Sequence, residues 1–94
     1  MADAFTPKFA DLVRNTTTTV GTGNFVLGPP ANGFTGFLAA LDPGDSFYYS
    51  AIGVDRPAER EIGRGTLQPD GTISRQPISG TPTNFGSGTK TLAL

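Results

Sequence analysis

The chain has 94 residues, a formal net charge of −1 and charged side chains at 16% of its positions, so we expect one domain with a small core. It contains no cysteine and no histidine, which excludes disulfides and thiolate metal sites and removes the side chains that most often serve in catalysis as nucleophile or proton carrier. The charge balance also lacks the basic excess that a general nucleic-acid binder needs.

Residues 1–12 are expected to form an N-terminal arm, followed by a single β domain over residues 13–94. Phe5, Phe9 and Leu12 fall at helical spacing, so a short helix is the alternative to an extended arm. The N-terminus lacks a basic start followed by an apolar stretch, and no segment approaches the roughly 20 apolar residues that span a bilayer. We therefore expect no signal peptide and no membrane partner.

The β-branched run from Val13 to Val20 predicts the first strand, with one solvated face lined by threonine hydroxyls. Residues 25–27 predict a second short strand, which Gly28-Pro29-Pro30 ends. Four apolar residues at i, i+3, i+4 and i+7 then predict a short helix or 3₁₀ turn packed across the open end of a sheet. These residues are Phe34, Phe37, Leu38 and Leu41.

The most strand-like stretch covers residues 46–52. Its alternation predicts two opposite faces, one with Phe47, Tyr49 and Ala51 and the other with Tyr48, Ser50 and Ile52.

Residues 59–67 and 72–79 flank Gln68-Pro69-Asp70-Gly71, which has the composition of a hairpin turn. Gly63 and Gly65 indicate a bulge or a close backbone approach. A last strand over residues 90–94 is expected to end inside the sheet. The core residues expected from the hairpin are Ile62, Leu67, Ile73 and Ile78.

Together these segments predict an all-β fold, a small β-sandwich or barrel of about six or seven short antiparallel strands with one short helix or 3₁₀ turn.

Pairs of carboxylates are the remaining candidates for a catalytic or metal-binding site. Glycosidases use a pair of carboxylates, and Glu59 and Glu61 would share a strand face. Asp42 and Asp45 flank a turn that would suit a calcium ion. Structural roles at a solvated strand and a turn are the favoured interpretation of both pairs. We therefore expect no catalytic residues, no metal and no cofactor.

Three arginines, Arg56, Arg60 and Arg64, lie four residues apart, a spacing that directs them to one face of a strand. Arg75 in the partner strand would join them. The favoured interpretation is an exposed hairpin whose arginines pair with nearby acidic residues. The alternatives are phosphate binding combined with stacking on the two tyrosines, and a protein interface, because arginine and tyrosine are enriched at hot spots.

Short motifs follow one another in a recognisable order over nearly the whole chain from about residue 11. They are Thr16 to Gly23, Phe25 to Gly28, Gly33 to Phe37, Gly44 to Tyr49, Arg60 to Leu67, Ser74-Arg75 and Asn84 to Lys90. This order resembles a small β module of phage and prophage structural proteins, found at the N-terminus of tail fibre or tail spike chains and as stand-alone virion proteins. A tryptophan often precedes the Glu-Ile/Val-Gly segment in that family, and Arg60 stands there in this chain.

The resemblance implies a virion structural protein, made in the cytoplasm of the bacterial host and acting as a tail-fibre anchor or adaptor or as a capsid decoration protein. Its expected partners are portal, tail or capsid proteins and further copies of itself, with a homotrimer favoured, and not nucleic acid. The residues expected at such interfaces are Phe5, Phe9, Leu12, Tyr48, Arg60 and Arg64.

Two other functions remain open. One is a glycan-binding module for host recognition that uses Tyr48, Tyr49 and Phe85 as stacking platforms. The other is an enzyme that uses one of the carboxylate pairs.

Overall fold

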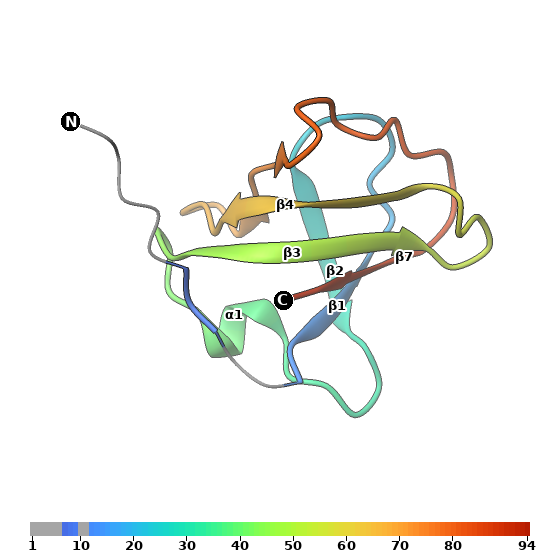
Figure 1. Cartoon of the computed structure of the whole chain (residues 1–94). Helices are drawn as coiled ribbons and strands as arrows, with labels where there is room; N and C mark the ends of the chain where they lie inside the picture. Colours follow the sequence, from blue (N-terminus) through green and yellow to red (C-terminus); the bar gives the residue numbers. More distant parts are fainter. Residues whose placement is uncertain (1–6, 10–11) are drawn as a thin grey trace.

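The computed structural model describes residues 7–9 and 12–94, drawn in colour in Figure 1. Within this part of the chain lie seven strands and one helical turn, which confirm the all-β class. The elements are β1 (Arg14–Thr17), β2 (Phe25–Pro30), α1 (Phe37–Ala40), β3 (Ser46–Gly53), β4 (Arg60–Thr66), β5 (Thr72–Ile73), β6 (Gln76–Pro77) and β7 (Lys90–Ala93). None of the helical structure in this region is long and apolar enough to cross a membrane.

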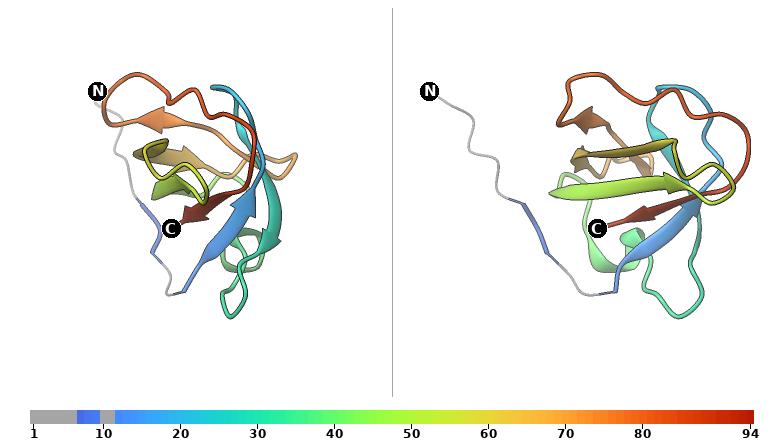
Figure 2. Two further views of the ribbon diagram at one scale, coloured as in Figure 1. Left: turned by 90° about the vertical axis from the view of Figure 1, so that its right-hand side faces the viewer. Right: turned by 45° about the vertical axis from the view of Figure 1, so that its right-hand side comes forward.

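The strands form one curled sheet with the order β5-β2-β1-β7-β3-β4-β6, and each pairing between neighbours is antiparallel. The last strand, β7, pairs with both β1 and β3, so the chain does end inside the sheet. A single bridge between Leu67 and Ile73 links the end of β4 to β5, which pairs with β2. The two ends of the sheet are thereby drawn together, and β1 and β2 cross behind β3 and β4 (Figures 1 and 2).

The concave side of this sheet holds the core. The inward positions of β3 alternate as expected, with Phe47, Tyr49 and Ala51 buried and the residues between them facing outward. Leu67 and Ile73 are buried as expected. The remaining buried apolar residues are Val13, Phe25, Phe37, Leu41, Phe85 and Leu92.

Two residues expected in the core lie outside it. Ile62 is 62% exposed and Ile78 is 68% exposed. The reason is the register of β4, which pairs with β3 so that Glu61, Gly63 and Gly65 face inward. The interior opposite these positions is already filled by the aromatic rings of β3, and glycine leaves room for them.

The threonine-rich segment forms only a four-residue strand, β1. One of its faces, with Thr16, is partly exposed as expected, whereas the opposite face is buried although it carries polar side chains. Thr17 is fully buried and its hydroxyl donates to the Val26 carbonyl over 2.7 Å. Asn15, also buried, donates from its amide to the Gly28 carbonyl and accepts from the Phe37 backbone N–H. The register between β1 and β2 shifts at this point, and the hydrogen bonds of these two side chains take the place of backbone hydrogen bonds between the strands.

The expected short helix forms as the single turn α1. Phe37 and Leu41 pack in the core, whereas Leu38 is exposed, so the four apolar residues do not share one buried face. The expected strand over residues 72–79 is likewise divided into β5 and β6. The turn between β4 and β5 forms as expected: the Gly71 N–H donates to the Gln68 carbonyl, and Gly71 has φ of 86°.

Candidate functional site

A buried ion pair lies inside the sheet, between Glu61 of β4 and Arg75, which follows β5. Both side chains are 2% exposed, and the guanidinium Nη2 lies 2.7 Å from Glu61 Oε1. Arg75 Nε also donates to Glu61 Oε2 over 3.1 Å, which makes the contact bidentate. The prediction that Arg75 joins the other arginines on one face is therefore wrong, because Arg75 faces the interior.

All five N–H donors of Arg75 have an acceptor. Besides Glu61, they reach the carbonyls of Gly21 and Gly23, at 3.0 and 3.1 Å, and the carbonyl of Thr83, at 2.8 Å. The guanidinium also lies over the ring of Phe25, 4.4 Å from its centroid. One side chain therefore joins β4, the turn between β1 and β2, and the loop before β7.

The Glu61 carboxylate is equally well satisfied. It accepts from Arg75, from the Tyr49 hydroxyl and from the Thr83 N–H, which is 2.7 Å from Oε1. Burial would raise the pKa of Glu61, but the hydrogen bonds from Arg75, Tyr49 and Thr83 outweigh it and hold that pKa below its usual value. Burial, reinforced by the neighbouring carboxylate, raises the pKa of Tyr49. The sequence signal for this cluster is parity, since Glu61 lies an even number of residues before the core residue Leu67.

The other acidic candidates stabilise turns. Glu59 precedes β4, accepts from the Gly86 N–H over 3.0 Å and lies 3.7 Å from the exposed Arg56. Asp45 accepts from the Asp42 N–H over 2.9 Å, which closes the turn before β3. Among residues 7–9 and 12–94, no three acidic side chains are placed to hold a metal ion together.

Three of the residues expected at an interface come together on the convex side of the sheet. Tyr48 of β3 is paired in register with Arg64 of β4, and Ile52 is paired with Arg60. All four side chains point outward. Ile62 lies between the two arginines and is paired with Ser50.

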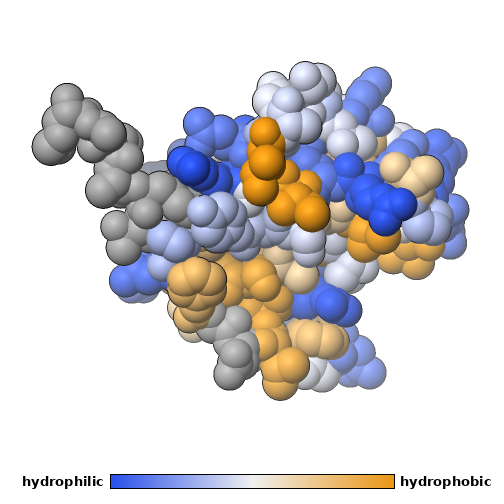
Figure 3. All heavy atoms as spheres, viewed as in Figure 1, coloured by the Kyte–Doolittle hydropathy of each residue, from blue (hydrophilic) through white to orange (hydrophobic). Residues whose placement is uncertain are grey.

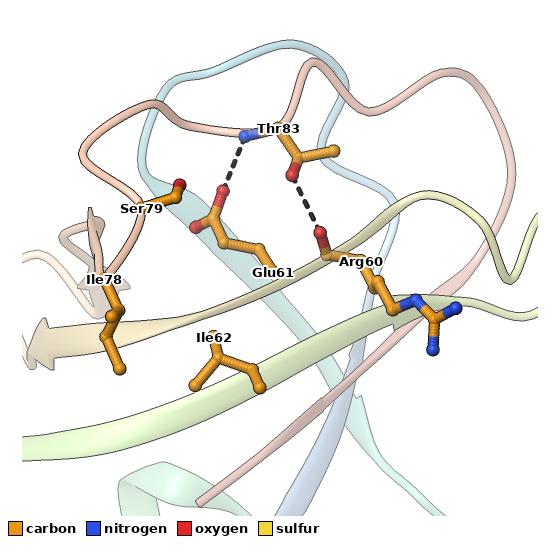
Figure 4. A pocket seen from close by; sticks show the side chains of 6 residues that line it. All are labelled: Arg60, Glu61, Ile62, Ile78, Ser79 and Thr83. Carbon is orange, nitrogen blue, oxygen red and sulfur yellow. Dashed lines mark hydrogen bonds between the residues drawn. The ribbon is translucent and has the colours of Figure 1, made fainter.

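Ile78 extends this surface beyond β6, since its N–H donates to the Ile62 carbonyl over 2.9 Å. Two shallow hollows flank it. One, of about 280 Å³, has Arg60, Ile62 and Thr83 in its lining, and the other, of about 250 Å³, has Arg64 and Gln76 in its lining. Figure 4 shows Ile62 and Ile78 on the near side of the sheet, whereas Glu61 is turned away from them toward Thr83. We call these six side chains the convex face: Tyr48, Ile52, Arg60, Ile62, Arg64 and Ile78.

Of the N-terminal candidates, the structure describes Phe9 and Leu12. Phe9 is 80% exposed and Leu12 is exposed too, so neither caps the core of its own chain. Lys8 is held to the start of β3, where its N–H donates to the Ser46 carbonyl over 2.7 Å. Phe5 lies outside the described residues.

The aromatic residues proposed for glycan stacking are mostly inaccessible. Tyr49 and Phe85 are 2% and 1% exposed, and both rings pack against Phe25 in the core. Tyr48 alone of the three reaches the surface.

Comparison with known proteins identifies no protein family, no curated protein and no solved structure that matches this chain. The resemblance to phage structural modules therefore stays a hypothesis drawn from the order of motifs.

Proposed function

We propose that this chain is a structural component of a phage virion that works through protein–protein contacts, as a tail-fibre anchor or adaptor or as a capsid decoration protein. The observation that carries the general part is the convex face. It exposes the large apolar side chains of Ile62 and Ile78 beside two arginines, on strands whose other side is a well-packed core. Exposed apolar groups beside charged ones are typical of interaction surfaces.

The structural roles of the acidic candidates support the same proposal. Glu61 is fully engaged by its hydrogen-bond donors, and Asp45 closes a turn, so neither is available as a catalytic base without loss of local structure. The glycan-binding alternative is weakened by the burial of Tyr49 and Phe85. The virion assignment itself is supported by the order of motifs along the sequence.

Mass spectrometry of purified phage particles from a host that encodes this chain tests the proposal. We expect peptides of the chain at a fixed ratio to a known structural protein, after treatment that removes loosely bound host proteins. A chain that is found in the host lysate but is absent from the purified particles would contradict the proposal.

A further inference from the structure

We propose that the convex face binds an acidic and apolar segment of a partner protein, in which an apolar side chain lies between two carboxylates. The inference rests on the proposed function in one respect, because both assume that the chain acts through contacts with other proteins. It adds the surface that is used and the chemistry of the partner.

The first step concerns the apolar part of the face. Ile52, Ile62 and Ile78 project from adjacent segments, and the sheet holds them in fixed register. In Figure 3, viewed from the side of β3 and β4, hydrophobic atoms gather over the middle of β4 and hydrophilic atoms lie on either side. The hollows on both sides of Ile78 are depressions that a side chain of the partner can fill.

The second step concerns charge. The strand positions on the convex face include Arg60 and Arg64 but no acidic residue, because Glu61 faces the interior. A partner with carboxylates therefore complements this face. A second convex face does not, since stacking two convex faces would bring arginines of both copies together.

The third step separates a protein from a nucleic acid. Bases bind to flat aromatic rings and basic grooves, whereas this face presents the branched aliphatic chains of Ile52, Ile62 and Ile78 and has a single aromatic, Tyr48. Aliphatic side chains of this kind pack against the apolar side chains of another protein. The observations therefore favour a protein partner.

The spacing of the arginines sets the spacing of the carboxylates. Arg60 and Arg64 are four residues apart in β4, which corresponds to about 13 Å along a strand. An extended partner segment would match them with carboxylates at positions i and i+4 and an apolar side chain at i+2, next to Ile62.

A synthetic peptide with the core Glu-Thr-Val-Thr-Glu is a suitable probe, titrated into isotopically labelled protein and followed by amide chemical shifts. We expect shifts confined to β3, β4 and β6, and affinity that falls as salt is raised. The variants Arg60→Glu and Arg64→Glu should each weaken binding about tenfold or more, because attraction becomes repulsion. Ile62→Ser should weaken binding at unchanged salt dependence.

Arg56→Glu is the matched control, because it makes the same charge change in the loop between β3 and β4, where the Arg56 guanidinium lies beside Glu59 and Gly86. It should leave the peptide affinity within about twofold, as expected for a charge change away from the interface. A peptide with lysine in place of both glutamates should not bind. Urea midpoints of all variants check that each is folded.

The inference is overturned if the peptide shifts no amide of the convex face, if both charge reversals bind as the wild type does, or if a single-stranded oligonucleotide binds this face more tightly than the peptide. These outcomes are separate from the particle experiment. If the chain is found in particles but does not bind the peptide, only this inference is overturned. If the chain binds the peptide but is absent from particles, only the proposed function is contradicted.

Discussion

Arg75 joins three segments of the chain that lie far apart in sequence, and its pairing with Glu61 is buried on both sides. A buried ion pair of this kind adds little stability compared with a well-packed apolar pair, but removing one of its partners strongly destabilises the fold. Removing one partner leaves the other charged and desolvated, at a cost of about 3–5 kcal/mol. Arg75, which the sequence pattern placed on the surface, is thus the arginine whose substitution should destabilise the fold most.

We expect Arg75→Met to lower the free energy of unfolding by about 3–5 kcal/mol, measured by urea titration with circular dichroism. Arg56→Met, which breaks the exposed pair with Glu59, should cost no more than about 1 kcal/mol. The double variant Arg75→Met with Glu61→Leu should cost less than the sum of its single changes. Equal costs for Arg75→Met and Arg56→Met would contradict the structural role of Arg75.

The pKa of Glu61 is lower in the folded chain than its ordinary value of 4.5. Its ionised form therefore contributes stability that is fully present above about pH 5 and is lost as the pH falls through the lowered pKa. We expect the urea midpoint of the wild type to drop as the pH falls below about 5. Glu61→Gln should start from lower stability at pH 7 and show a shallower drop. A parallel pH dependence in both proteins would assign the acid sensitivity to other carboxylates.

At the level of elements, the alternation within β3 was sufficient to separate its two faces, and the structure buries the one with Phe47, Tyr49 and Ala51. The same reasoning was wrong for β4, where isoleucine faces solvent and a charged residue faces the core. The pairing of Glu61 with Arg75, 14 residues away, helps to make that register favourable. Pairing across such a separation leaves no periodic trace in the sequence. Of the convex face, the sequence therefore indicated the two arginines and placed Ile52 on the face of Tyr48. Ile62 and Ile78 were instead expected in the core.

Gly63 shows why β4 takes this register. A Cβ at Gly63 would lie 2.6 Å from the Gln76 carbonyl oxygen and 2.8 Å from the Tyr49 hydroxyl. We expect Gly63→Ala to force β6 away from β4 and to destabilise the fold by about 1–3 kcal/mol in a urea titration. Gly23→Ala is the control, since a Cβ there meets nothing within 4 Å, and it should be neutral or slightly stabilising. Similar costs for the two substitutions would show that β6 moves freely.

At the level of the whole molecule, the sequence predicted a small β-sandwich or barrel, and the chain forms a single curled sheet whose ends approach through β5. Strand order was beyond prediction, because β7 inserts between β1 and β3 and is distant in sequence from both. Self-association stays a prediction of the sequence. It can be tested on the N-terminal segment, because Phe9 and Leu12 place apolar side chains in solvent on one chain alone.

We expect size-exclusion chromatography with light scattering to give a mass above the 9.8 kDa of one chain, with a trimer as the favoured state. Phe9→Ser should lower that mass by weakening contacts between copies. In dilute solution, where single chains dominate, it should change the free energy of unfolding by less than about 0.5 kcal/mol, because Phe9 is exposed. Lys8→Ser controls for substitution in the same segment without loss of an apolar side chain, and should leave the mass unchanged. A wild type that is a single chain at every concentration would contradict the arm as a contact between copies. A Phe9→Ser variant that loses stability at unchanged mass would instead place the side chain against its own domain.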